Sequence, residues 1–485
     1  MRVRVLLLSL WTFIVGGCAL GPDYERPPVM QPDSFRMQQG ESLEEVSLAD
    51  LGWWELFQDE NLQALIRKAL VENKDVRIAV ARVREARAQL AATGADQFPR
   101  IDGNGSIQRN QPAGAQVRQF GFPGGAFTPP ATNQFRATMD LSFELDFWGR
   151  LRRATEAAQA DLLARESTRR TVVLTLVSDL ATAYFELQEL DAELEAARRT
   201  LKTRQEALDL IRLRKLVGQR STLDIRRAEQ EVARARAVIP DLERQIGQKE
   251  HQLSLLMGRN PARILRGVSL RDQPLPPEVP AGLPSALLER RPDIVEAEQK
   301  LVAANARIGV AKAAFFPQIS LTGNFGAQSL QFSELFVGAS RVWQFGPTLT
   351  VPLFDAGRNL ANLEVSQAQR EQAVIAYEKT IQQAFREVED ALLAHQKIRE
   401  IRTERERTVG LSREAVELAQ LEYLNGQASY LEVLTAQREA LNAETALAQT
   451  QRNHLLAVVQ LYKSLGGGWT AQPVSPDLAM REAPE

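Results

Sequence analysis

A strictly alternating stretch, residues 134–147, constrains the fold of this chain more than any other feature. Every second residue from Phe135 to Phe147 is apolar, the residues between them are polar, and three of those are acidic. A period of two predicts a β-strand with one apolar face and one polar face. Fourteen residues at about 3.3 Å each extend roughly 46 Å, far beyond the 5–6 residues of an ordinary globular strand.

The sequence also contains an internal duplication. Residues 73–101 align with residues 291–319 at an offset of 218, whereas later positions align at an offset of 208. Glycines mark this second alignment, and they pair as Gly149 with Gly357, Gly218 with Gly426, and Gly258 with Gly466. We expect two copies, the first with a loop ten residues longer in the Gly- and Pro-rich segment 108–133.

The long strand recurs in the second copy. Residues 341–354 carry apolar side chains at the positions equivalent to those of the first strand, and weaker candidates, Ile101–Ile107 and Ile319–Phe325, precede the two long strands. Four strands leave unpaired edges, which lipid excludes, and the smallest spanning barrels have about eight strands. The strands should therefore be pooled between chains. The alternative, a soluble sandwich with its apolar faces packed together, fits poorly with the export signal described next.

The chain begins with an export signal. Arg2 and Arg4 precede an apolar run, residues 5–15, that is too short to span a membrane, and Gly16, Gly17 and Cys18 follow. Residues 15–18 resemble a bacterial lipobox, in which Cys18 would carry diacylglycerol and an acyl chain. The residue after Cys18 is Ala19 rather than Asp, and by the rule for such lipoproteins this predicts transport to the outer membrane. The alternative is an ordinary signal peptide with an incidental cysteine.

Two very long helices follow the long strands. Residues 150–217 contain neither Pro nor Gly, and residues 358–425 contain only Gly410. At about 1.5 Å per residue each helix would be roughly 100 Å long. A coiled-coil seam is indicated by leucines that recur every seven residues, at Leu180, Leu187, Leu194, Leu201 and Leu208. A glycine turn ends each long helix, and a second helix returns from it.

Composition and motifs argue against other classes of protein. With 59 basic and 61 acidic residues the net charge is −2, which gives no electrostatic reason to expect nucleic acid as a partner. The three histidines lack metal-hydrolase spacing, and neither a G-x-S-x-G elbow nor a P-loop occurs. We expect no enzyme, no metal site and no cofactor beyond the lipid on Cys18. The remaining rival is a structural lipoprotein that spans the periplasm without conducting, although it would not need a polar strand face.

Several motifs together resemble the TolC/OprM/NodT-type outer membrane factor family. They are "GWWELFQDENLQALIRKALVENKDVRIAVARV" (52–83), "DFWGRLRRATEAA" (146–158), "LPSALLERRPDIVEAEQKLVAANARIGVAKAAFFPQISLTG" (283–323), "VPLFDAGR" (351–358) and "YLNGQASYLEVLTAQR" (423–438). The resemblance implies a mainly α fold with membrane β-structure: a coiled-coil α-barrel continuous with a shared twelve-strand transmembrane β-barrel, four strands per protomer.

The resemblance also implies function and partners. It predicts a homotrimer in outer-membrane lipid that serves as the passive exit duct of a tripartite efflux system for small molecules such as drugs. A periplasmic adaptor and an inner-membrane RND-type transporter would complete the system. Type I protein secretion and metal-ion efflux remain alternatives.

The expected domain organisation has six segments. They are a signal peptide (1–17), a lipidated and equatorial segment (18–58), the first repeat (59–258), a Pro-rich equatorial linker (259–284), the second repeat (285–466) and a C-terminal tail (467–485).

Two groups of functional residues are assigned, the gate by carry-over from the family and the docking tips from their place at the two hairpin turns, where an adaptor would dock. The periplasmic gate is assigned to Tyr423, Leu431, Thr435 and Arg438. Many family members have Asp at the position of Thr435, which bears on cation preference. The adaptor-docking tips are assigned to Arg214, Lys215, Gly218, Gln219, Arg220, Ser221, Gly426, Gln427 and Ser429. The alternative for each is an ordinary surface residue at a helical turn.

Overall fold

The computed structural model describes residues 19–30, 32, 34–36, 48, 51–111, 131–216, 222–274 and 284–467. The chain divides into two compact units, which are treated separately below. The sheet unit comprises residues 1–27, 84–164 and 298–376, and the helical unit comprises residues 28–83, 165–297 and 377–485. No helix among the described residues has a segment long and apolar enough to span a membrane.

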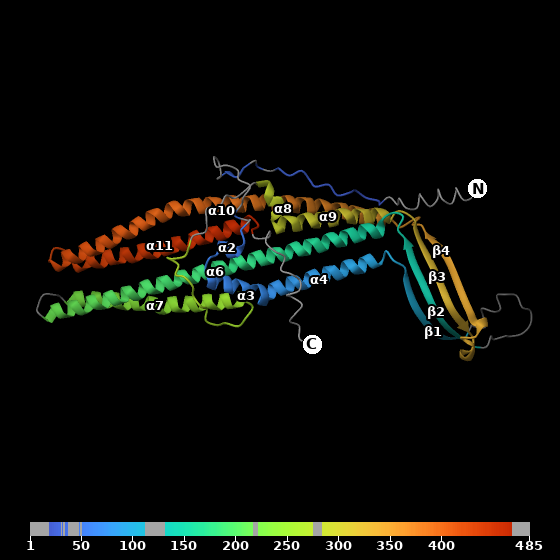
Figure 1. Cartoon of the computed structure of the whole chain (residues 1–485), viewed down its shortest axis with the longest axis horizontal. Helices are drawn as coiled ribbons and strands as arrows, with labels where there is room; N and C mark the ends of the chain where they lie inside the picture. The colour runs from blue at the N-terminus through green and yellow to red at the C-terminus, as the bar shows by residue number, and fades with distance from the viewer. Residues whose placement is uncertain are drawn as a thin grey trace, which may run out of the picture. The chain divides into compact units, whose positions relative to one another are not determined.

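The elements follow one another twice in the same order (Figure 1). In the first half they are α2 (Trp53–Leu56), α3 (Glu60–Glu72), α4 (Lys74–Ala95), β1 (Arg100–Asn110), β2 (Thr132–Leu145), α6 (Arg150–Leu216) and α7 (Thr222–Leu256). In the second half they are the 3₁₀ turn η4 (Pro284–Ala286), α8 (Leu287–Arg290), α9 (Pro292–Ala313), β3 (Gln318–Ser329), the 3₁₀ turns η5 (Phe332–Glu334) and η6 (Gly338–Ser340), β4 (Arg341–Thr350), α10 (Arg358–Leu424) and α11 (Tyr430–Ser464).

The lengths of the helices match between the halves. Helices α6 and α10 each have 67 residues, α7 and α11 each have 35, and α4 and α9 each have 22. Their first and last residues are related by the same offsets, 208 and 218, that align the sequences. The duplicated sequence thus folds into duplicated elements, although the six predicted domain boundaries stay a prediction.

The four strands form one antiparallel sheet in the order β1-β2-β3-β4. The central pair, β2 with β3, joins the two copies, so that Phe135 lies opposite Ser329 and Leu145 opposite Ile319. Each copy contributes one hairpin, as the sequence predicts.

The predicted ends of the long strands are wrong by a few residues. Strand β2 ends at Leu145, because the chain turns there and the Phe147 amide donates to the Leu145 carbonyl at 2.9 Å. Strand β4 ends at Thr350, because Pro352 has no N–H to donate to the ladder and restricts Val351 before it.

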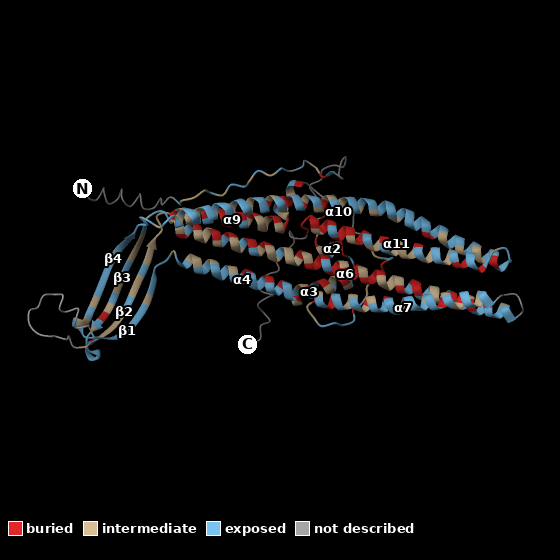
Figure 2. Cartoon of the chain, turned by 180° about the vertical axis from the view of Figure 1, so that it is seen from behind, coloured by how far each residue is buried: buried red, intermediate tan, exposed pale blue. Residues whose placement is uncertain are grey.

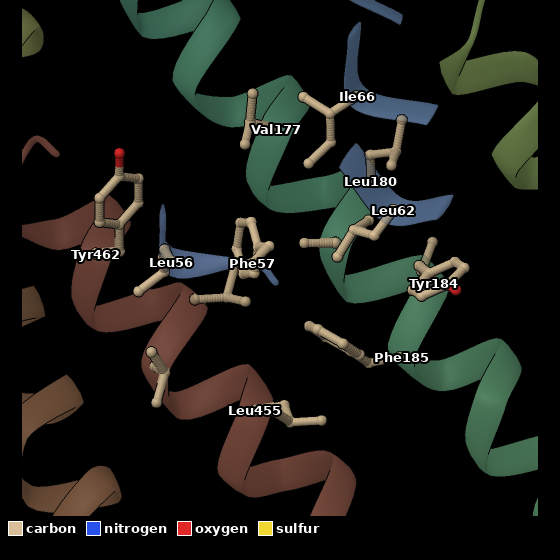
Figure 3. Close-up of a cluster of buried hydrophobic side chains, with 14 of the residues drawn as sticks. Leu56, Phe57, Leu62, Ile66, Val177, Leu180, Tyr184, Phe185, Leu455 and Tyr462 are labelled. Carbon is tan, nitrogen blue, oxygen red and sulfur yellow. The ribbon is translucent and has the colours of Figure 1, made fainter. Parts of the chain in front are cut away.

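An apolar core holds the helical unit together (Figure 3). Leucines of the predicted seam lie in it: Leu180 and Leu187 are fully buried, and Leu194 is nearly so. Helix α11 contributes Leu455 and Tyr462. Residues of α2, α3 and the turn between them pack onto this core: Leu56, Phe57, Leu62 and Ile66.

A buried carboxylate fixes the start of α3 against α6. The Asp59 side chain accepts hydrogen bonds from the backbone amides of Asn61 and Leu62, which makes it the N-cap of α3. It also accepts a bond from the Tyr184 hydroxyl at 2.9 Å. Burial, reinforced by the Asp59 charge, raises the pKa of Tyr184, so that the hydroxyl stays a donor.

Two glycines near the end of α7 offer a matched stability test. Gly258 has φ +74°, and a Cβ there would collide with the Glu72 carbonyl, whereas Gly247 is helical with nothing within 4 Å of such a Cβ. We expect Gly258→Ala to destabilise by at least about 1–3 kcal/mol, and Gly247→Ala to stabilise by up to about 0.5–1 kcal/mol. Thermal unfolding of the detergent-solubilised protein, followed by helical circular dichroism, measures both. Equal melting temperatures for the two variants would contradict the tight approach at Gly258.

Candidate functional site

The strand register assigns every side chain of the sheet to one of two faces. Residues paired across antiparallel strands share a face, and all pairs join odd with odd or even with even numbers. The odd face is apolar, with exposed side chains from all four strands: Ile101, Ile107, Met139, Phe325, Trp343, Phe345 and Leu349. The even face is polar. Figure 2 shows the strands mostly in the colours of exposed and intermediate residues, unlike the red-striped helices.

The acids of the long strand have structural partners. Asp140 accepts a hydrogen bond from Asn104 on β1. Glu144 forms a two-point ion pair with Arg150, at 2.9 and 2.6 Å, which raises the pKa of Arg150. Asp146 accepts from the first amides of α6, so it serves as a cap of that long helix. The polar face therefore carries charge that is locally balanced.

A compact junction joins the strands to the long helices. The Trp148 indole donates to the Pro317 carbonyl at 2.7 Å, and its ring lies 4.8 Å from that of Phe316. This contact ties the end of β2 in the first copy to the turn before β3 in the second. Gly149 follows with φ +75°, a conformation that glycine adopts without strain.

The N-terminal segment, residues 19–26, lies against this junction. The Leu20 amide donates to the Trp148 carbonyl at 3.0 Å, and a Cβ on Gly149 would lie 2.7 Å from the Ala19 Cα. Arg153 of α6 donates to Asp23 at 2.6 Å, and Asn305 of α9 donates to the Pro22 carbonyl at 2.8 Å. Cys18 itself lies outside the described residues. The residue after it, Ala19, packs against Gly149 at the strand–helix junction.

A second apolar cluster, which we call the tip cluster, joins the two helical hairpins within one chain. Its members from α6 and α7 are Leu208, Ile211, Ala228 and Val232, and those from α10 and α11 are Tyr423, Tyr430, Val433 and Leu434. It lies near the ends of α6 and α10, where each hairpin turns.

Tyr423, assigned to the gate, lies inside the tip cluster. Its side chain is only 5% exposed, its ring is 5.6 Å from that of Tyr430, and the Arg214 guanidinium lies 5.2 Å from its centroid. This cation–π contact links the end of α6 to the end of α10. Burial, with the neighbouring Tyr423, raises the pKa of Tyr430 to about 12. Nearby, burial lowers the pKa of Arg204, which pairs with Glu231.

The other three gate residues lie outside the tip cluster. Leu431 is 57% exposed, and the Thr435 hydroxyl donates to the Leu431 carbonyl of its own helix at 2.9 Å. Arg438 is exposed and donates to the adjacent Glu439 at 3.4 Å. The structure therefore does not bring the four residues together within one chain. Sequence reasoning missed Tyr430, although it stands seven residues after Tyr423.

Local turn chemistry accounts for several residues assigned to the docking tips. Gly426 has φ +78°, and the Gln427 amide donates to the Glu422 carbonyl at 2.8 Å. Ser429 and Glu432 form a capping box at the start of α11. In the first hairpin Lys215 donates to Thr222 at 3.1 Å. The other residues assigned to this tip, Gly218, Gln219, Arg220 and Ser221, lie outside the described residues.

Comparison with known proteins identifies the family. The model of the outer membrane efflux protein family matches residues 65–259 and 283–467. The toluene efflux pump outer membrane protein TtgC of Pseudomonas putida is 39% identical over 97% of each chain. The cation efflux system protein CusC of Escherichia coli K12 is 36% identical over 93% of this chain and 96% of CusC. A membrane protein structure from Pseudomonas aeruginosa superposes with a TM-score of 0.85 at 36% identity, over 93% of this chain and 98% of that one.

These matches extend over both copies of the duplication and nearly the whole length of the relatives. They confirm the family, the fold class and the outer-membrane location that the sequence motifs predict. The chain belongs to the outer membrane efflux protein family and is an efflux protein of the outer membrane.

Proposed function

We propose that this chain is the passive, homotrimeric exit duct of a tripartite efflux system. The observation that carries the proposal is the two-faced sheet, whose middle has apolar residues or glycine at the odd-numbered positions and mainly polar residues at the even ones. A barrel with an apolar exterior and a polar interior is a water-filled pore in lipid. No catalytic step is needed, because the inner-membrane pump supplies the energy.

The backbone hydrogen-bonding groups along the two edge strands of the sheet also need partners. Within the described residues, β1 and β4 each pair on one side only. Lipid excludes open edges, so β4 of one copy pairs with β1 of the next. Because β4 is the duplicate of β2, and β1 that of β3, this contact repeats the β2–β3 pairing already present inside the chain. Three copies give twelve strands; the number three comes from the family resemblance.

The cargo we propose is small organic molecules such as drugs. TtgC is named for toluene and CusC for cations, and both are similar to this chain along nearly their whole length. The locally balanced charges of the even face, such as Glu144 with Arg150, favour a broad rather than a cation-selective duct. Metal-ion efflux is the second candidate, supported by the similarity to CusC.

The lipid on Cys18 would enter the membrane beside the sheet. Ala19 and Leu20 are held at the strand–helix junction, and they directly follow the residue that would carry the acyl chain. Four strands per chain supply a separate hold on the membrane.

The helical tips would receive the periplasmic adaptor. Equivalent leucines are exposed at both tips, 55–85% each: Leu213 and Leu216 in the first, Leu421 and Leu424 in the second. Exposed apolar side chains of this kind mark a protein-binding surface. Among the described polar positions named for the tips, Gln427 lies at the turn between α10 and α11.

The facing of the sheet can be tested with two arginine substitutions in β2. Met139→Arg places a charge against acyl chains, at a cost of about 2–4 kcal/mol near the midplane, and should reduce insertion. Ser142→Arg, on the even face, should insert normally and shift the reversal potential toward anions in a planar bilayer. Heat-modifiable mobility measures insertion. Equally poor insertion of both would reverse the assignment of the faces.

The gate can be tested at Tyr423 with two substitutions that separate ring from hydroxyl. Tyr423→Ala removes the ring between Arg214 and Tyr430, and loss of a buried aromatic ring costs about 3–5 kcal/mol in a core. The hairpins should then separate more readily, raising single-channel conductance and antibiotic entry. Tyr423→Phe keeps the ring and serves as the control. If the alanine variant conducts like wild type, the constriction does not depend on the tip cluster.

Lipidation can be tested by Cys18→Ser. The variant should lose incorporation of radiolabelled palmitate, since the hydroxyl is not a lipoprotein acceptor. It should still be found in the outer membrane, because the strands hold it there. Palmitate label in the variant would mean that another residue accepts the lipid.

A further inference from the structure

Polar residues occur on the apolar face of the sheet only at one end of the strands. Among the odd-numbered strand residues, the polar ones are Arg109, Asn133, Ser329 and Arg341, and the two arginines are the only charged ones. Arg109 pairs with Asn133 and Arg341 with Ala327. This is the end away from the Trp148 junction. We call Arg109 and Arg341 the rim arginines; both are exposed.

A short apolar loop lies at the same end. The rim loop, residues 330–340, connects β3 to β4 and is held by its own hydrogen bonds. The Ser329 hydroxyl donates to the Gln331 carbonyl at 2.8 Å, and the Ser340 hydroxyl to the Glu334 carbonyl at 2.7 Å. Phe332 packs on Phe135, with ring centroids 5.6 Å apart. Since Phe135 is an odd-face residue, the loop reaches over the apolar face.

Other apolar side chains of the rim loop are exposed. Phe336 is 80% exposed, Leu330 65% and Val337 54%. Its only charged residue is Glu334. An ordered loop with exposed aromatic and aliphatic groups, beside two exposed cations, offers separate contacts for acyl chains and for an anionic head group.

The positions of the rim arginines fit a membrane interface rather than the membrane interior. An arginine on the lipid face is strongly destabilising at the midplane and nearly neutral near the interface. A guanidinium also binds phosphate through two parallel hydrogen bonds. The best ligand for such a surface is therefore a lipid with a phosphorylated head group and several acyl chains.

We propose that the rim arginines and the rim loop bind a phosphorylated, multiply acylated glycolipid of the outer leaflet. This rests on the proposed function, which turns the odd face to lipid. The N-terminal segment lies at the junction end, so the rim end is the one that reaches the opposite leaflet. Arg109 is on edge strand β1 and Arg341 on edge strand β4, so pairing between copies brings one arginine from each of two chains to every seam.

The test uses full-length protein in nanodiscs and a purified outer-leaflet glycolipid, either phosphorylated or enzymatically dephosphorylated. Native mass spectrometry gives the affinities. An arginine near an anionic surface contributes about fivefold in affinity. We expect Arg109→Gln and Arg341→Gln each to weaken binding of the phosphorylated glycolipid about fivefold, and the double variant roughly 25-fold. The double variant should also lose the preference for phosphorylated over dephosphorylated lipid.

Arg136→Gln is the matched control, because Arg136 lies in the same sheet but on the even face. It should bind the glycolipid like wild type. Wild-type affinity in the double variant would overturn the proposal, as would equal binding of phosphatidylglycerol in place of the glycolipid. Insertion and conductance of the double variant should equal wild type. A loss of either would instead point to a failure of the proposed pore, which the Met139 and Ser142 substitutions test separately.

Discussion

The backbone hydrogen bonds between the four strands determine most of what this chain can do. Once Phe135 pairs with Ser329, the facing of every other strand residue follows, because the side-chain period is two. The apolar residues then have nowhere to be buried within the chain: Met139, Phe325 and Trp343 are each more than 60% exposed. In water such a surface would aggregate, whereas in the proposed homotrimer it would face lipid and the edge strands would pair with other copies.

The duplication makes this arrangement easy to build. Equivalent glycines at both strand–helix junctions, Gly149 and Gly357, have positive φ, as do Gly258 and Gly466 after the return helices. A glycine with positive φ therefore precedes the long helix in each copy. The copies are then tied together where they meet, by the bond from Trp148 to the Pro317 carbonyl.

Periodicity and turn residues predicted the elements well because these signals are local. The long helices end within one residue of the predicted positions, Leu216 for Val217 and Leu424 for Asn425. The end of β4 was missed although Pro352 is a local signal. The contacts of the N-terminal segment could not be predicted, because Leu20 binds the backbone of a residue 128 positions away. Likewise, the family pattern pointed to Tyr423, but only the fold shows that its ring is buried against the other hairpin.

The tip cluster shows why duplicated hairpins are not interchangeable. At the positions equivalent to Tyr423 and Tyr430, the first copy has Lys215 and Thr222. The aromatic rings of the second hairpin therefore pack on the leucine and isoleucine of the first, and the reverse contact cannot form. In the proposed homotrimer, the seam between neighbouring chains at the tips would offer Lys215 and Thr222 where the seam within a chain offers two tyrosines. Buried aromatic area stabilises a contact far more than an exposed lysine does. In that homotrimer, the divergence of the two copies would make the contact between hairpins at the tips stronger within each chain than between chains.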